Sequence, residues 1–436
     1  MRLSLTDSQT GPRLTRVVHL PGAVLLGLGS IVGTGAFVSI GIAAGVAGPS
    51  VLLAIVLAGL LATCNGLSSA QLAAAHAVSG GTYEYGYRYL TPSLGFTAGW
   101  MFMSAKSASA ATAALGLAGY LLTAAEVGGR GTQVALGVLA VGAVSALVWH
   151  GTSNSNRANA IIVSVTLGTL ALFVIAGWRT ASANSASTLS GVLPGPGGTR
   201  GLLEATALMF VAYTGYGRIA TLGEEVTNPA RTIPRAVIVT LAVSILLYVS
   251  VGLVAVGSVG APRLAEMTAT RAAPLEDAAR IFAGPGLARI LAVGAITAML
   301  SVLLNLVLGL SRVLLAMARR GDVPHRLATI DEARSSPTAA VAVVAVIIGL
   351  LVLIGDVKTT WSFSAFTVLV YYALTNLAAL RLPPEAQRFP RWISAAGLAG
   401  CLGLAFWVEW RVWAAGLAVI AAGFLWRALI RRREAR

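Results

Sequence analysis

The stretch Gly29-Ser30-Ile31-Val32-Gly33-Thr34-Gly35 interrupts the first apolar run of the chain. Glycine in a helix interior costs up to about 1 kcal/mol relative to alanine, and in lipid every lost backbone hydrogen bond needs a local replacement. Either the small residues let helices pack closely, or the helix opens and exposes N–H groups to an anion. The glycines fall on two helix faces with Thr34 between them, which favours an open helix.

The composition indicates a membrane protein. Of the 436 residues, 56% are hydrophobic and 11% are charged, whereas a soluble domain carries about 25% charged residues. So few charges could not hydrate a water-facing surface, but a lipid-facing surface needs none. The net charge of +15 does not predict nucleic-acid binding, because the basic residues lie in short connections rather than on one helix face.

The chain contains about 12 apolar runs long enough to cross a bilayer. It is therefore predicted to be an all-α integral membrane protein with about 12 transmembrane helices. Basic residues are concentrated in alternate connections and in the C-terminal tail, which predicts that both termini are cytoplasmic in a multi-pass cell-membrane protein, from a bacterium by composition. The runs are 17–45, 49–75, 93–123, 132–149, 157–178, 201–223, 235–258, 285–319, 337–354, 358–380, 390–408 and 411–431.

Two connections on the opposite side have distinctive sequences. Residues 182–201 are rich in Ser, Gly and Pro and are predicted to form a flexible link. Residues 273–282 are predicted to form a short amphipathic helix on the surface, where they either cover a pathway or simply pack on the bundle.

The sixth run carries a second interruption, Tyr213-Thr214-Gly215-Tyr216-Gly217. Breaks in the first and sixth runs are what two inverted repeats of five helices predict, with a ligand bound between the broken helices. Free N–H groups at the start of a half-helix suit a carboxylate, and unwound carbonyls suit a cation.

Four segments resemble motifs of amino-acid permeases of the amino acid–polyamine–organocation superfamily. They are 29–37 followed by Ala47-Gly48-Pro49, then 79–85, 223–236 and 319–324, in the family's order. The last two apolar runs match only in hydropathy.

The resemblance implies a leucine-transporter-type fold that works by alternating access, with repeats at 17–178 and 201–380. The ten-helix core then spans 17–380, and two extra helices follow at 390–431. A cytoplasmic tail precedes the core at 1–16, and a basic cytoplasmic tail ends the chain at 432–436. Carried over by position, the N–H groups of Gly33, Thr34 and Gly35 would bind a substrate carboxylate. The substrate ammonium group would meet the carbonyls of Ile31, Val211 and Thr214.

Lys106 lies inside the third run, among small polar residues. A lysine at membrane depth is costly and marks a functional site by default, although a lysine that snorkels to an interface is the alternative. In many proton-coupled relatives a lysine stands on helix five, but here Thr166 occupies that position. We therefore expect Lys106 to supply the missing charge and to exchange a proton during transport.

Arg218 follows the second break and could contact either the substrate or Glu224 and Glu225 nearby. If Lys106 and Arg218 both line the cavity, an acidic or neutral substrate is favoured over a cationic one.

Two further groups of residues are candidates. Thr297, Ser301 and Asn305 share one helix face and could bind sodium. Sodium is less expected than a proton as the coupling ion, because no carboxylate accompanies these residues. The alternative is that they form hydrogen bonds between helices. Tyr213 and Tyr216 flank Gly215, and one of them is expected to shape or gate the cavity, although both could serve ordinary packing.

The sequence thus predicts a secondary active permease for amino acids, working as a proton-linked or ion-independent symporter or exchanger. Polyamines or other organic ions are alternative substrates. A channel or a membrane-embedded enzyme is an alternative of another class, but no filter repeat, catalytic cluster or metal-ligand pattern is present. No cofactor is predicted.

Overall fold

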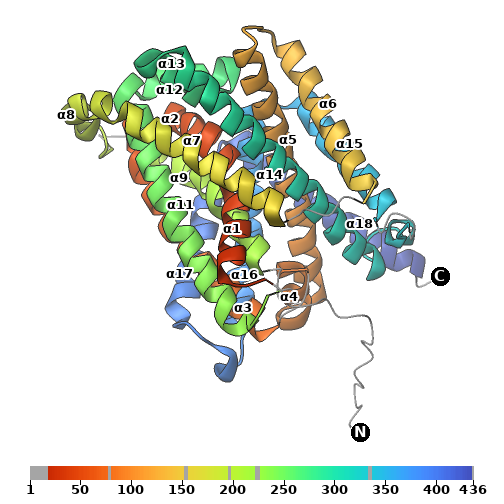
Figure 1. The fold of residues 1–436 in the computed structure, drawn as a ribbon. Coiled ribbons are helices and arrows are strands. Elements are labelled where there is room, and N and C mark those ends of the chain that lie inside the picture. The colour runs from red at the N-terminus through yellow and green to blue at the C-terminus, as the bar shows by residue number, and fades with distance from the viewer. Residues whose placement is uncertain are drawn as a thin grey trace.

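The computed structural model describes residues 18–76, 80–151, 156–194, 198–220, 226–331 and 336–434. Within these ranges the regular elements are helices, accompanied by two isolated β-bridges that join Val18 to Val226 and Asp331 to Ser336. The helices pack side by side into one bundle (Figure 1). The predicted cytoplasmic tail at 1–16 and the last two residues of the predicted tail at 432–436 lie outside the described residues, and residues 432–434 continue α18.

Eight helical segments in the described part of the chain are long and apolar enough to cross a membrane. One of them is the continuous segment Gly35–Ala75, which includes α3 (Val51–Ala75). The other seven lie on α5 (Pro92–Ala124), α6 (Arg130–Trp149), α7 (Asn156–Ala183), α11 (Pro229–Val259), α14 (Pro285–Arg319), α16 (Val357–Leu380) and α18 (Trp410–Glu434).

The remaining predicted runs correspond to shorter helices. These are α1 (Leu20–Ile31), α9 (Thr199–Tyr213), α15 (Thr338–Ile354) and α17 (Arg391–Ala405).

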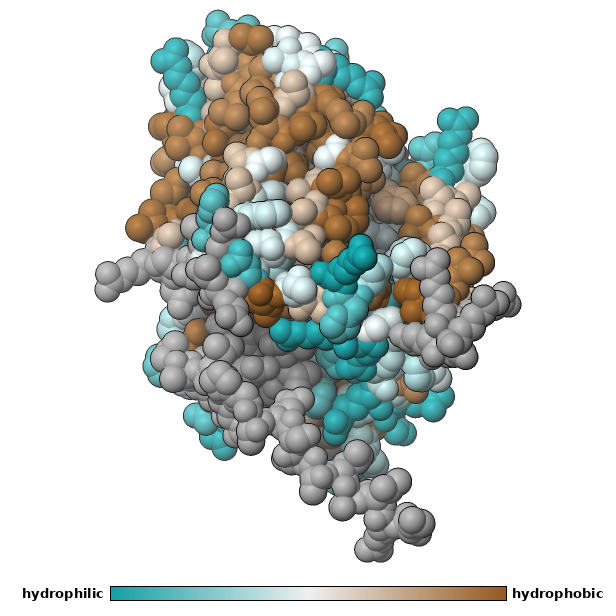
Figure 2. Space-filling view, turned by 90° about the vertical axis from the view of Figure 1, so that its right-hand side faces the viewer, coloured by the Kyte–Doolittle hydropathy of each residue, from teal (hydrophilic) through white to brown (hydrophobic). Residues whose placement is uncertain are grey.

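A broad hydrophobic zone covers much of the face seen in Figure 2, with hydrophilic residues toward its ends. The chain is therefore an all-helical, multi-pass membrane protein.

Helices α5 and α16 are the most buried of the candidate spans and pack against each other, and small residues at their contact allow close approach. The Ser109 and Ser364 hydroxyls lie 2.7 Å apart, and the Thr112 hydroxyl donates to Thr360 at 2.8 Å. Helices α6, α15 and α18 lie at the edge of the bundle (Figure 1).

The first helix is interrupted where the glycines lie. After α1, Val32 has φ −83° and ψ 101°, and the chain continues through a π-helical turn, η1 (Gly35–Ser39), into α2 (Ile40–Ala47). The helix is open, and its glycines also pack closely. A Cβ on Gly29 would meet Asn159 of α7, and one on Gly33 would meet Val302 of α14.

The second interruption lies directly against the first. Helix α9 ends at Tyr213, followed by a 3-10 turn, η3 (Thr214–Tyr216), and the short α10 (Gly217–Ala220). A Cβ on Gly215 would collide with the backbone of Ser30 and Ile31. Glycine is therefore required for the two breaks to touch.

Two helices cross one end of the bundle, α12 (Ala261–Arg271) and α13 (Pro274–Ala283) (Figure 1). The predicted surface helix at 273–282 corresponds to α13, which packs against α14, α7 and η1. On the same side, α8 (Ser185–Ser190) lies within the predicted flexible link at 182–201, so part of that link is helical.

Two of the quoted loop motifs meet at the other end of the bundle. Helix α4 (Thr82–Tyr89) places the Tyr83 hydroxyl 2.6 Å from a carboxylate oxygen of Asp322, just beyond α14. Arg320 pairs with Glu84 at 2.5 Å. The motifs at 79–85 and 319–324 therefore form one contact, although Ser79 lies outside the described residues. The smaller turns are η2 (Gly48–Ser50), η4 (His325–Ala328) and η5 (Pro384–Ala386).

We predict that Gly215→Ala lowers the free energy of unfolding by about 1–3 kcal/mol, because the new methyl group overpacks the contact between the breaks. Thermal unfolding of the purified protein in detergent measures the change. The matched control is Gly142→Ala on α6, where a Cβ meets nothing within 4 Å. That change should leave stability unaltered or raise it by roughly 0.5–1 kcal/mol. Equal effects of the two substitutions would contradict the close contact at Gly215.

Candidate functional site

A cavity lies where the two interrupted helices meet α5, α14 and α16. Its lining combines polar backbone at the breaks with hydroxyl, ammonium and apolar side chains. The lining residues are Ser30, Ile31, Thr34, Gly35, Lys106, Ser109, Val211, Ala212, Thr214, Gly215, Val302, Leu306 and Trp361. Most of the predicted substrate-binding residues therefore meet at one place.

The first break brings polar groups to this cavity. The N–H groups of Ala36 and Phe37 both donate to the Gly33 carbonyl, at 3.0 and 3.1 Å, so the regular helical ladder is lost here. The Thr34 hydroxyl is buried and has no hydrogen-bond partner among the described residues. A buried hydroxyl without a partner at a cavity is a position where a ligand can supply the missing hydrogen bond.

The predicted ammonium-binding carbonyls already accept hydrogen bonds from hydroxyl groups. The Tyr248 hydroxyl of α11 lies 2.8 Å from the Ile31 carbonyl, and the Thr214 hydroxyl donates to the Val211 carbonyl at 2.8 Å. The Tyr372 hydroxyl of α16 donates to the Thr214 carbonyl at 3.1 Å. A carbonyl oxygen has two lone pairs, and the Val211 carbonyl uses both, because it also accepts the backbone N–H of Thr214.

Lys106 reaches into the cavity from α5. Its Nζ donates to the Thr214 hydroxyl at 2.9 Å, and no acidic residue is among the residues that line the cavity. Within the described chain, no salt bridge to Lys106 is present. The cavity therefore contains one lysine cation held by a neutral partner.

Apolar side chains form the remaining wall. Val302 and Leu306 of α14 and Trp361 of α16 line the cavity. The Trp361 indole N–H donates to the Leu208 carbonyl at 2.9 Å, which holds the ring against α9. These residues were not among the candidates from sequence, because the apolar runs alone do not reveal which face of α14 or α16 turns toward the breaks.

Several predicted site residues do not line the cavity. The Thr166 hydroxyl donates to the Ile162 carbonyl within α7, and the Thr297 hydroxyl bonds to the Val293 and Gly294 carbonyls within α14. Ser301, Asn305 and Arg218 are also absent from the lining. The predicted partners of Arg218, Glu224 and Glu225, lie outside the described residues.

The tyrosines of the second break point away from the cavity. Tyr213 and Tyr216 are both fully buried, and neither is a lining residue. The Tyr213 hydroxyl donates to the Ile55 carbonyl of α3 at 3.1 Å. Tyr216 packs against the ring of Tyr372, with 5.4 Å between ring centroids. In this arrangement the tyrosines anchor the break, and Thr214 and Gly215 are its residues that line the cavity.

Comparisons with known proteins agree on one family. A family model described as amino acid permease matches residues 22–434. An uncharacterized transporter of Mycobacterium tuberculosis is 38% identical over 423 residues, which is 97% of this chain and 93% of that protein. A branched-chain amino acid permease of Bacillus subtilis is 27% identical, covering 87% of this chain and 84% of its own length. A methylthioribose transporter of Bacillus subtilis is 28% identical, covering 77% of this chain and 74% of its own length.

We predict that the cost of Thr214→Val depends on Lys106. With Lys106 present, the substitution removes the partner of a buried cation and should cost about 1–3 kcal/mol of unfolding free energy. In a Lys106→Met background the same substitution should cost distinctly less. A double-mutant cycle followed by thermal unfolding measures the difference, with Thr297→Val as the matched control. An identical cost in both backgrounds would disprove the contact.

Proposed function

Since the chain belongs to the amino acid permease family, we propose that it is a secondary active transporter that carries amino acids across the membrane by alternating access. The observation that carries the proposal is the cavity between two touching helix breaks. Such a site is accessible from either side when the two halves of a bundle rock against each other.

The two ends of an amino acid suit the two breaks. A carboxylate fits beside Thr34 and Gly35, where a new helical segment begins and its dipole is positive. The unpartnered Thr34 hydroxyl adds a donor there. An ammonium group is proposed to bind the carbonyls of Ile31, Val211 and Thr214, and at Val211 it would replace the hydrogen bond from the Thr214 hydroxyl.

We propose a leucine-transporter-type architecture of 12 transmembrane helices for this site. The repeats are 17–178 and 201–380, each beginning with an interrupted helix, and 390–431 adds two helices outside the repeats. Both termini are proposed to lie in the cytoplasm, because the basic residues of the connections and the C-terminal tail are concentrated on that side in the sequence. The paired breaks of α1–η1 and α9–η3 support the repeat.

The substrate is proposed to be a neutral amino acid with an apolar side chain. Lys106 opposes cationic amino acids and polyamines, because no acidic residue lines the cavity to balance a second cation. Val302, Leu306 and Trp361 offer an apolar wall to the substrate side chain. The relative named for branched-chain amino acids fits this substrate class.

Transport is tested by counterflow in proteoliposomes. Vesicles loaded with an unlabelled amino acid should take up the labelled form from the medium to above its equilibrium level. Neutral apolar amino acids added to the medium should inhibit this uptake most strongly. A thermal-shift screen with all amino acids and common amines, with and without sodium, identifies the ligands beforehand. Conductance without saturation would indicate a channel, and preference for a diamine would contradict the proposed substrate class.

Proton coupling is proposed to use Lys106, and it gives a separate prediction. Lys106→Met should retain exchange of labelled for unlabelled substrate but lose accumulation driven by an acidic outer medium, because its side chain cannot carry a proton. Uptake with and without an imposed pH gradient measures both properties, with Thr297→Val as the control. Accumulation by Lys106→Met equal to that of the wild type would show that the proton is bound elsewhere or that transport is ion-independent.

A further inference from the structure

Glu276 is a buried acid far from the candidate site in sequence. It lies on α13, outside the candidate spans, and its side chain has an exposed fraction of 0%. One carboxylate oxygen accepts a hydrogen bond from Arg280 at 3.1 Å. The other oxygen, Oε2, is buried without a partner among the described residues. A buried ionised carboxylate with an unmet oxygen is costly, and a proton removes that cost.

Few charged groups surround this carboxyl. On α13 itself they are Arg280 and Asp277, and on α12 Arg271 lies 3.8 Å from Asp277. From α5 the Tyr120 side chain lies near Glu276 and Asp277. Glu126, just beyond α5, lies 3.8 Å from Arg280. Glu126 is 78% exposed, so Arg280 connects the buried carboxyl with the surface.

The other elements packed on α13 add no further partner. Arg179 of α7 and Arg289 of α14 are exposed, while η1 and residues 249–259 of α11 contain no titratable side chain. Burial is the main reason that the pKa of Glu276 rises to about 7; Arg280 opposes the rise and Asp277 adds to it. Glu276 therefore binds its proton more tightly when α13 is seated than when it is free, so the stabilisation of the seated α13 is full below about pH 4.5 and is lost as the pH rises from there through about 7.

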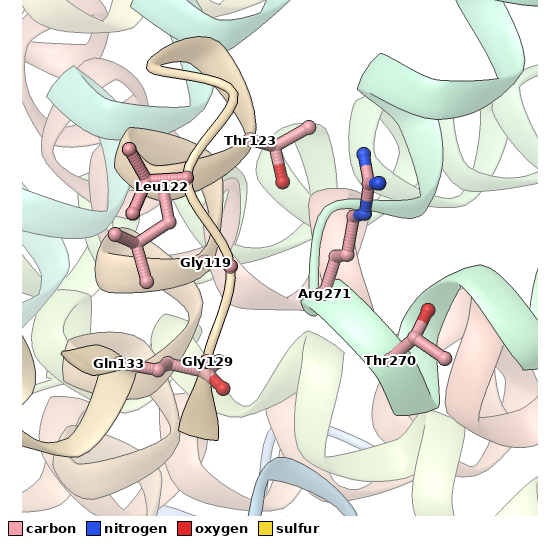
Figure 3. A pocket seen from close by; sticks show the side chains of 9 residues that line it. Gly119, Leu122, Thr123, Gly129, Gln133, Thr270 and Arg271 are labelled. Carbon is pink, nitrogen blue, oxygen red and sulfur yellow. The ribbon is translucent and has the colours of Figure 1, made fainter. Parts of the chain in front are cut away.

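Helix α13 is joined to the first break through α5. The Tyr120 hydroxyl donates to the Phe37 carbonyl of η1 at 2.9 Å, and the two rings meet edge to face. Phe37 is two residues beyond Gly35 of the cavity. The turn between α12 and α13 also seats tightly on α5, because a Cβ on Gly119 would collide with the Arg271 carbonyl. Figure 3 shows Arg271 across a small pocket from Gly119 and Thr123.

We propose that Glu276 is a proton-binding site on the face that carries α12 and α13, and that it binds a proton when α13 is seated on η1 and releases it when α13 lifts. The proton comes from water on that face, and a carboxylate becomes a neutral carboxylic acid. Seating of α13 thereby consumes one proton from that side. This site is separate from Lys106, and its existence does not depend on which substrate is carried.

Infrared titration of the purified protein in lipid nanodiscs, without substrate, tests the site directly. The carbonyl stretch of a protonated carboxylic acid should titrate near pH 7 in the wild type and be missing in Glu276→Gln. The matched control, Glu266→Gln, replaces an exposed acid on the neighbouring α12 and should keep the band. A band that persists in Glu276→Gln, or no band titrating near neutral pH in the wild type, would overturn the proposal.

A second measurement follows the movement of α13. Ala279 is fully buried on this helix, so Ala279→Cys, in a background with Cys64→Ser and Cys401→Ser, reports when α13 lifts. Labelling by a membrane-impermeant maleimide should speed up between about pH 5 and pH 7 by more than the increase in thiolate and follow thiolate alone above pH 7, and the excess should vanish when Glu276→Gln is added. If Glu276→Gln fails to fold, Arg280→Gln should move the infrared midpoint to higher pH. Labelling that follows thiolate alone across the whole range, or an unmoved midpoint, would refute the link.

Discussion

Lipid offers no hydrogen bonds to an opened helix, and the centre of this protein is organised around that constraint. The helix breaks at Val32–Thr34 and Thr214–Tyr216 lie against each other at Gly215. Hydroxyl groups from Tyr248 and Tyr372 then satisfy carbonyls of the two breaks. Both tyrosines stand on helices of the second half of the chain, α11 and α16, so the break in the first half depends on a tyrosine of the second half.

The positions of the helices could be predicted because hydropathy is a local property. Each predicted apolar run corresponds to a helix or to a helix with a break, and the glycines of both breaks identified where the regular hydrogen bonding is lost. From sequence, an open helix and close glycine packing were alternatives for residues 29–35, but the first break shows both. Gly29 and Gly33 pack against different helices while the chain between Ile31 and Gly35 is open.

The lining of the cavity was harder to predict, because it depends on how each helix is rotated in the bundle. On α14 the apolar Val302 and Leu306 face the breaks, whereas the polar set at Thr297, Ser301 and Asn305 does not line the cavity. Tyr213 and Tyr216 are near the site in sequence but are used for packing. Lys106 could be singled out because a cation at membrane depth is unusual in any rotation.

The hydrogen bond between Lys106 and Thr214 joins α5 to the second break. Thr214 in turn donates to the Val211 carbonyl, so a chain of donors leads from the lysine to the end of α9. A charged donor makes a hydrogen bond about twice as strong as a neutral donor. The charge on one side chain of α5 therefore sets how firmly that helix is fastened to the second break.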